Sequence, residues 1–210
     1  MKTFRIIFLV LCCLCAVSTF AQQNDLTQED KKELQERVKM KVEEFQQYLK
    51  DIVNTKLSET QRQSSIKSAL ALFIGKGNAY SVKNDDGEME RRNPVRMQLS
   101  NVYNKKTRWL RMTRYLNNQY NNIHKYGVVE IESADAVRVD NIYKVGDGRY
   151  QAVAYFCQRY AAKTKDGVFV YGPEVTSKKV IVHIDAIETP VGTVWDAKLG
   201  DVYVTATKLD

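Results

Sequence analysis

The sequence predicts an α+β protein in which N-terminal helices pack on a curved antiparallel sheet. Apolar residues recur every three or four positions up to about residue 127, and they alternate with a period of two from Val128 onward. The later segments are joined by short, hairpin-like connections. Such connections join antiparallel neighbours, because a parallel crossover needs a dozen or more residues. Helices that precede an antiparallel meander are typical of helices layered on one face of a sheet.

The first expected helix begins after Thr27, because Thr27-Gln28-Glu29-Asp30 resembles a capping box with Asp in place of the usual Glu. Its apolar stripe has a spacing of three or four residues and consists of Leu34, Val38, Val42, Phe45, Leu49 and Ile52. A stripe this apolar must be buried. We expect it to pack on the protein's own sheet. The alternative is a contact with another chain, either in a homodimer or with an envelope partner.

Two further helices are expected. Ser58-Glu59-Thr60-Gln61 is a second capping box, and it begins a shorter helix that Gly75 terminates. The third helix covers residues 105–124, and its apolar side consists of Trp109, Met112, Leu116, Tyr120 and Ile123. The polar stretch between these helices predicts loops, with short strands at residues 79–82 and 95–103.

The second half of the chain predicts a run of strands. Candidate strands cover residues 128–132, 136–145, 149–162, 168–171, 178–188 and 193–207. We therefore expect one α+β domain over residues 58–210, with residues 22–57 as an extra N-terminal helix.

Residues 1–21 have the three parts of a secretory signal peptide. Two basic residues precede an apolar run over residues 6–17, and the small residues Thr19 and Ala21 suit cleavage before Gln22. The run is shorter than the ~20 residues that span a bilayer, which disfavours a membrane anchor. We expect a periplasmic or secreted protein with no transmembrane segment after cleavage.

Composition excludes several classes of protein. The 210 residues are 44% hydrophobic and 27% charged, with a net charge of +7, which is ordinary for a globular protein and unlike a disordered or collagen-like chain. Cleavage leaves Cys157 as the single cysteine, so neither an internal disulfide nor a cysteine-based zinc site is expected. The sequence contains no phosphate-binding loop, dinucleotide fingerprint or His-Glu-x-x-His motif. We therefore expect no cofactor and no metal.

Two phrases in the later strands resemble a known family. They are Tyr155-Phe156-Cys157-Gln158-Arg159-Tyr160, and Trp195 followed by Leu199-Gly200-Asp201-Val202. With the element order, they resemble secreted nuclear-transport-factor-2-like, or cystatin-like, cone-fold proteins of uncharacterised function from Gram-negative gut bacteria. The resemblance covers residues 58–207 and implies a cone-shaped sheet. It implies a secreted, non-catalytic ligand-binding or protein-interaction module of the bacterial envelope, whose partner is a small apolar ligand or an envelope protein.

His183 and Asp185 are the candidates for catalysis. They lie two residues apart on one face of an expected strand, where a histidine and a carboxylate could serve as a general base and its orienting group. This supports the alternative of a small cofactor-free isomerase or hydrolase; the other possibility is an exposed strand face or a hydrogen-bonded core histidine. Ketosteroid isomerase, which shares the cone fold, needs an Asp base and an oxyanion hole. Tyr155, Glu130 and Tyr203 lie on strands suited to such roles, but no phrase matches the motif of that enzyme.

A group of basic residues predicts a second alternative, the binding of an anionic polymer. The group lies on the third expected helix and the turn before it, and consists of Lys105, Lys106, Arg108, Arg111 and Arg114. The three arginines fall within about 120° of arc on a helix. Lipopolysaccharide, anionic lipid and extracellular nucleic acid are candidate polymers, without sequence-specific recognition of nucleic acid. A solvated helix face is the other interpretation.

Overall fold

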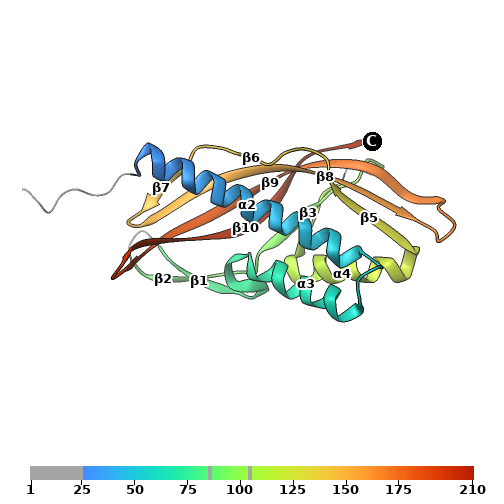
Figure 1. Cartoon of the computed structure of the whole chain (residues 1–210), viewed down its shortest axis with the longest axis horizontal. Helices are drawn as coiled ribbons and strands as arrows, with labels where there is room; N and C mark the ends of the chain where they lie inside the picture. Colours follow the sequence, from blue (N-terminus) through green and yellow to red (C-terminus); the bar gives the residue numbers. More distant parts are fainter. Residues whose placement is uncertain (1–25, 85–86, 104–105) are drawn as a thin grey trace, which may run out of the picture.

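The computed structural model describes residues 26–84, 87–103 and 106–210 (Figure 1). The expected signal peptide over residues 1–21 lies outside these ranges, and so does Lys105. Within the described ranges, helices pack on a mixed eight-stranded sheet, which confirms the α+β class.

The elements have the following bounds in chain order. The helices are α2 (Gln28–Val53), α3 (Glu59–Ala71) and α4 (Met112–Tyr126), with a 3₁₀ turn, η1, at Ile74–Gly77. The strands are β1 (Tyr80–Lys83), β2 (Met89–Arg92), β3 (Arg96–Leu99), β4 (Arg108–Arg111), β5 (Val128–Ser133), β6 (Arg138–Val139), β7 (Tyr143–Gly146), β8 (Arg149–Lys163), β9 (Phe169–Thr189) and β10 (Gly192–Leu209). β1 and β2 form a separate hairpin.

The sheet is built on three long strands, β8, β9 and β10, which follow one another as antiparallel hairpins. β5, β6 and β7 pair in turn along the other edge of β8. On the far side, β10 pairs with β3 in parallel, at Val202 and Met97, and β3 pairs with β4. The expectation of a wholly antiparallel sheet is therefore wrong. Short connections fix the direction of consecutive strands only, whereas α4 and most of the sheet separate β3 from β10 along the chain.

β9 is a single strand where two were expected. Gly172-Pro173, which separates the expected strands 168–171 and 178–188, does not end it. Gly172 has a φ of +70°, and a Cβ at this position would lie 2.5 Å from the backbone oxygen of Tyr160 on β8. Glycine therefore lets the two backbones approach closely, and the pairing of β8 with β9 continues on both sides of this irregularity.

The third helix begins later than expected, at Met112. The residues before it form β4, which pairs with β3 from Leu99 opposite Arg108 to Arg96 opposite Arg111. Cross-strand pairing therefore overrides the helical spacing that the sequence continues back to residue 105. At its other end α4 stops at Gly127, which has a φ of +103° and donates its N–H to the Ile123 carbonyl.

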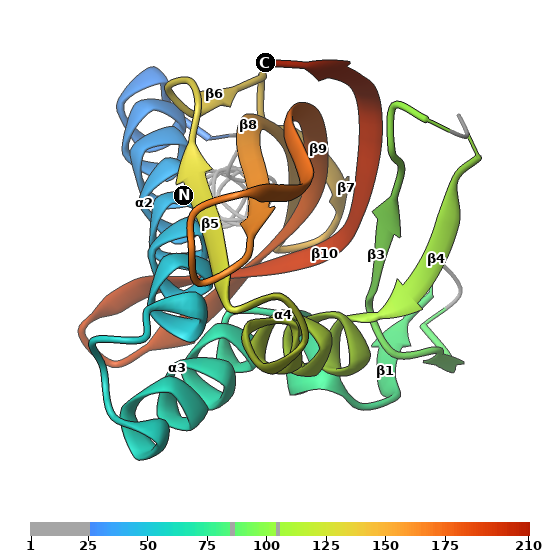
Figure 2. The ribbon, with the colours of Figure 1, turned by 90° about the vertical axis from the view of Figure 1, so that its right-hand side faces the viewer.

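α2 lies along one side of the long strands, next to β5 and above α3 and α4 (Figure 2). Its capping box is present: the Thr27 side chain accepts from the Asp30 N–H, and the Asp30 carboxylate accepts from the Thr27 N–H. Every residue of its apolar stripe is at most 1% exposed. α2 contacts β5, β8 and β10 as well as α3 and α4. The prediction that the stripe packs on the protein's own sheet is therefore confirmed.

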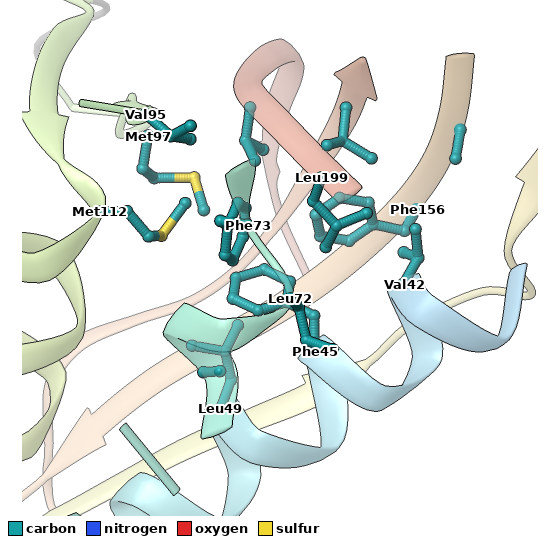
Figure 3. Close-up of a cluster of buried hydrophobic side chains, with 14 of the residues drawn as sticks. Val42, Phe45, Leu49, Leu72, Phe73, Val95, Met97, Met112, Phe156 and Leu199 are labelled. Atoms are coloured by element: carbon teal, nitrogen blue, oxygen red, sulfur yellow. The ribbon is translucent and has the colours of Figure 1, made fainter. Parts of the chain in front are cut away.

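Three aromatic rings connect the layers of the core (Figure 3). Phe45 of α2 meets Phe73 edge to face, with ring centroids 5.0 Å apart, and meets Phe156 of β8 at 6.4 Å. Beside them, the N–H of Leu199 on β10 donates to the carbonyl of Leu72 at 2.9 Å. One aromatic cluster thus joins α2, the end of α3 and the long strands.

Candidate functional site

A pocket of about 710 Å³ lies between α4, the inner face of β8 and β9, and the segment that joins β3 to β4. This volume is within the range of roughly 300–1,000 Å³ that is typical of small-molecule sites. In Figure 2, α4 crosses below the curved strands, with β3 and β4 beside it. The elements that form the pocket thus lie side by side in space although they are far apart in the sequence.

The inner face of the sheet changes from apolar to polar where it reaches the pocket. On β9, the inward-facing residues are apolar over positions 180–184, and Lys178, Thr176 and Glu174 continue the same face. β8 changes in the same way at Gln158, which pairs with Thr176. All four polar side chains are buried. Each of them has a hydrogen-bond partner within the protein, as buried polar side chains need. This end of the sheet therefore gives the pocket a polar wall.

α4 presents a second stripe beside its buried apolar one. The members of this stripe recur at helical spacing and line the pocket: Tyr115, Asn118, Gln119, Asn122 and Tyr126. Amide side chains both donate and accept hydrogen bonds. The helix therefore supplies the pocket with adaptable polar groups between two aromatic rings.

Lys178 has an environment that is unusual for a lysine, because its side chain is only 5% exposed. Its Nζ donates to Oε1 of Gln158 at 2.7 Å and lies 5.6 Å from the centroid of the Tyr115 ring. Burial lowers the pKa of Lys178 to about 8, although the nearby Glu174 carboxylate favours the charged form. No carboxylate among the described residues lies within 4.0 Å of this ammonium. Lys178 is thus a buried cation without an ion pair in that part of the chain.

Glu174 lines the same pocket and is also only 5% exposed. Its Oε2 accepts a long hydrogen bond, 3.4 Å, from the backbone N–H of Val102. Burial raises the pKa of Glu174, against the opposing effects of the Tyr171 hydroxyl, the Val102 N–H and Lys178. The pocket therefore contains a buried acid and a buried base that are not in direct contact.

Two tyrosines lie next to Glu174. Tyr160 and Tyr171 meet edge to face with ring centroids 5.7 Å apart, and Nδ2 of Asn122 donates to the Tyr160 hydroxyl at 3.1 Å. Burial raises the pKa of both tyrosines well above its usual value. Both hydroxyls therefore stay protonated at neutral pH: that of Tyr171 donates to the Glu174 carboxylate, and that of Tyr160 is able to donate to a ligand.

Basic side chains lie at the mouth of the pocket. Lys106, Arg108 and Lys125 line it and are exposed to solvent. A cleft lined by charges of one sign raises the local concentration of ligands of the opposite sign. The mouth therefore favours the entry of anionic ligands.

The expected anion patch does not lie on one helix. Arg108 is on β4 and faces the pocket, whereas Arg111 lines a separate hollow with Arg91 and Arg92. Arg114 is exposed on the first turn of α4. The expectation that they share one helix is wrong, because residues 108–111 form a strand, in which consecutive side chains point to opposite faces. Binding of an anionic polymer by these residues stays a hypothesis. Lys105 lies outside the described residues.

His183 and Asp185 lie on the opposite face of β9 from Lys178, and they do not line the pocket. Asp185 is exposed. His183 is half-buried, and its ring packs against Gly200: a Cβ added to this glycine would lie only 2.9 Å from Nε2 of His183. Nδ1 of His183 is 3.5 Å from Nε2 of Gln151. Burial lowers the pKa of His183. Partial desolvation of the carboxyl raises the pKa of Asp185, although the residue as a whole is exposed. The two residues lie on one strand face, as expected, and their catalytic role stays a hypothesis.

The other residues considered for isomerase chemistry also lie away from the pocket. Tyr155 is on the outer face of β8, with the Arg138 guanidinium 4.5 Å above its ring. Tyr203 is directly opposite Lys179 on that same outer face. Glu130 of β5 forms an ion pair with a lysine of β8 at 2.7 Å. None of these three candidates lines the pocket.

Sequence analysis missed Glu174, Lys178 and the amide stripe of α4. Two signals could have found them. The polar residues at positions 174, 176 and 178 alternate with the same period as the apolar residues that follow them. The amides at positions 118, 119 and 122 recur at helical spacing beside the apolar stripe. A polar segment that continues a core-facing stripe indicates a lined pocket rather than a solvated surface.

The described part of the chain lacks two further features, a metal-ligand cluster and a membrane-spanning helix. There, no group of three or more His, Cys, Asp and Glu side chains is placed to hold a metal ion. Among the helices of the same residues, none is long and apolar enough to cross a membrane.

Comparisons with known proteins assign no family. No family model matches the chain, and no curated protein matches it. A similar solved structure is the crystal structure of the Kfla4162 protein from Kribbella flavida, which is 10% identical. The alignment covers 82% of this chain and 94% of that chain, with a TM-score of 0.34. At this degree of similarity, the neighbour says nothing of what the present chain binds.

Proposed function

We propose that this protein is a non-catalytic, small-ligand-binding module of the bacterial envelope, and that Lys178 holds an anionic group of the ligand. The observation that carries the proposal is a buried ammonium in the wall of the 710 Å³ pocket, with no carboxylate of the described residues within 4.0 Å. Small-molecule sites combine a mostly enclosed volume with a few placed polar groups. The pocket between α4, β8 and β9 is a cleft of suitable volume, half open to solvent, and its walls carry such polar groups.

The ammonium of Lys178 is buried, and among the described residues its close partners are only neutral groups. Taking a charge out of water is costly unless it is paired and hydrogen-bonded. The Gln158 carbonyl and the Tyr115 ring supply only neutral partners. A carboxylate or another oxyanion would form a charge-assisted hydrogen bond with Nζ, which is stronger than a bond to a neutral acceptor. An anionic ligand group would therefore stabilise the buried charge.

The residues that line the pocket change the chemical class of ligand that we expect, because the family resemblance implies a small apolar ligand. A purely apolar ligand would displace solvent from Glu174, Lys178 and the α4 amides without using their remaining hydrogen-bonding capacity, at a cost for each polar group. The tyrosine rings supply apolar surface beside these polar groups. The ligand is therefore small and amphipathic, and it carries an anionic group. The curvature of β8, β9 and β10 around this region in Figure 2 supports a cone-shaped, nuclear-transport-factor-2-like sheet.

The two alternatives have less support than ligand binding. His183 and Asp185 lie on the outer face, away from the enclosed volume that a small isomerase or hydrolase would need. Of the described basic residues expected to bind an anionic polymer, Arg111 and Arg114 do not line the pocket, whereas Lys106 and Arg108 lie at its mouth. Their position there favours the attraction of small anions to the pocket.

Binding of matched anionic and neutral compounds tests the proposal. In calorimetric titrations of a panel of small aryl and alkyl carboxylates, we expect 3-phenylpropionate or a relative to bind and its neutral amide to bind at least tenfold more weakly. Lys178→Met should weaken carboxylate binding at least tenfold, which corresponds to a loss of about 1.4 kcal/mol of binding free energy. Lys179→Met is the matched control, because Lys179 is the next residue on β9 and faces the opposite side, near the Tyr203 ring. It should leave binding unchanged.

Three results would contradict this proposal. The first is a carboxylate and an amide that bind equally well to the unaltered protein. The second is a Lys178→Met variant that retains full carboxylate affinity. The third is the absence of binding by every carboxylate of the panel at millimolar concentration.

Location is tested separately, by intact mass. Because residues 1–21 have the parts of a signal peptide, we expect the mature chain in a Gram-negative host to begin at Gln22 and to appear in the periplasm or the medium. A mass that corresponds to residues 1–210, in a membrane fraction that resists carbonate extraction, would overturn this prediction.

A further inference from the structure

We infer that the ligand of this pocket carries a positive group as well as a negative one, and that Glu174 holds the positive group while Lys178 holds the negative one. The inference rests on the proposed function and names its ligand class: a small zwitterion, such as a free amino acid or an amino-acid-like compound. The observation behind this inference is that two buried, oppositely charged side chains, Glu174 and Lys178, line one pocket.

The positions of the two residues suit a bridging ligand. Glu174 and Lys178 lie on the same face of β9, four residues apart, so that their Cα atoms are roughly 13 Å from each other along the strand. Both side chains are only 5% exposed, and both line the pocket. Among the ion pairs of the described residues, none joins them within 4.0 Å. Each charged end is therefore able to meet a ligand group between them.

Neither charged end is fully satisfied by its neighbours. An ionised carboxylate has about four acceptor sites, and among the described residues Glu174 accepts only from the Tyr171 hydroxyl and, at a long 3.4 Å, from the Val102 N–H. An ammonium has three donors, and Lys178 uses one in its 2.7 Å bond to Gln158 and another in a weak 3.8 Å contact with the Met97 sulfur. A ligand with one cationic and one anionic end would supply charged partners to both residues at once.

The electrostatics of the walls also favours a ligand of low net charge. A simple anion would gain from Lys178 but would be repelled by the Glu174 carboxylate, since both lie in a poorly solvated pocket. A zwitterion aligned with its acid toward Lys178 and its amine toward Glu174 would gain from both. The amides of α4 and the tyrosine hydroxyls could then bind the remaining polar atoms.

Calorimetric titration with charge-matched probes tests the inference. 3-Phenylpropionate carries only the acid, and phenethylamine carries only the amine. Phenylalanine and 3-[4-(aminomethyl)phenyl]propionate carry both groups, at a short and a long separation. We expect at least one of these zwitterions to bind at least tenfold more tightly than 3-phenylpropionate, and phenethylamine to bind most weakly.

Two variants test which residue binds the positive group of the ligand and which binds the negative group. Glu174→Gln, which preserves the shape of the side chain, should remove the advantage of the zwitterion while the affinity for 3-phenylpropionate stays or rises. Lys178→Met should weaken the binding of both the zwitterion and 3-phenylpropionate. A second measurement needs no variant: because the pKa of Glu174 is raised by burial, acidification should reduce the advantage of the zwitterion in the unaltered protein as Glu174 becomes protonated.

The outcomes separate this inference from the proposed function. If 3-phenylpropionate binds as tightly as both zwitterions, or if the advantage survives in Glu174→Gln and at acid pH, the inference is overturned and the proposed function stands. If a zwitterion binds the unaltered protein and binds Lys178→Met equally well, then Lys178 does not hold the negative group of the ligand and that assignment is wrong. If neither acid nor zwitterion binds the unaltered protein, both proposals fail.

Discussion

Replacing Phe45 with alanine should lower the free energy of unfolding by about 3–5 kcal/mol. Phe45 is 1% exposed, and its ring meets Phe73 and Phe156 edge to face at 5.0 and 6.4 Å. Alanine would remove apolar area from the core and leave a cavity between α2, the end of α3 and β8 that rigid neighbours fill only in part. Urea unfolding followed by circular dichroism measures the change.

The control variant lies on the same helix. Met40 of α2 is 65% exposed, so Met40→Ala should change the free energy of unfolding by no more than about 0.5 kcal/mol. A loss below about 1 kcal/mol in Phe45→Ala would mean that α2 is not an integral part of the core. Equal losses in both variants would point to helix propensity rather than packing as the cause.

Local patterns predicted the elements that depend on neighbouring residues. The stripe of α2 was predicted because its spacing puts all six apolar residues on one side of the helix, and its burial follows from their apolar area. Both capping boxes form, at Thr27 and at Ser58, because each bond joins residues only three positions apart. The hairpins of β8, β9 and β10 were predicted in the same way, from turn residues between alternating segments.

The elements that were mispredicted depend on partners far away in the chain. β4 is a strand because it pairs with β3, although its residues continue the spacing of α4. β3 pairs in parallel with β10 only after the chain has passed through α4 and the long hairpins. β9 runs through Gly172 because the backbone of β8 comes within the distance that only glycine permits. Propensity is a weak predictor where such tertiary contacts compete.

The candidate site was missed for a related reason. A period of two predicted that His183 and Asp185 share a face of β9, and they do. The period does not say which face is enclosed, because that depends on where α4 packs. α4 covers the face of Glu174 and Lys178 instead. The lysine was assigned to the start of a strand, where an exposed charge is ordinary, so its burial could not be inferred from its neighbours in sequence.

The stability of the protein should rise between pH 8 and pH 9.5 because of Lys178. Its pKa is about 8 in the folded protein, against an ordinary value of 10.5. Between these two values the unfolded chain binds more protons than the folded one, so the free energy of unfolding increases with pH. The gain is about 1.4 kcal/mol per pH unit, or about 2 kcal/mol from pH 8 to pH 9.5. Urea unfolding of the unaltered protein across this range measures it.

Lys178→Met isolates this contribution, because the variant retains every other titrating group. The difference in unfolding free energy between the variant and the unaltered protein should be constant below pH 8 and should then shift by about 2 kcal/mol in favour of the unaltered protein by pH 9.5. Burial raises the pKa of Tyr115 to about 12, which lowers stability only above pH 10, so titration of this tyrosine does not mask the effect. The ¹⁵N shift of Lys178 Nζ should titrate near pH 8 in the folded protein. A midpoint near the ordinary value, or a difference that does not change with pH, would show that the ammonium is solvated, and the pocket would then lack the buried cation that recognises an anionic group.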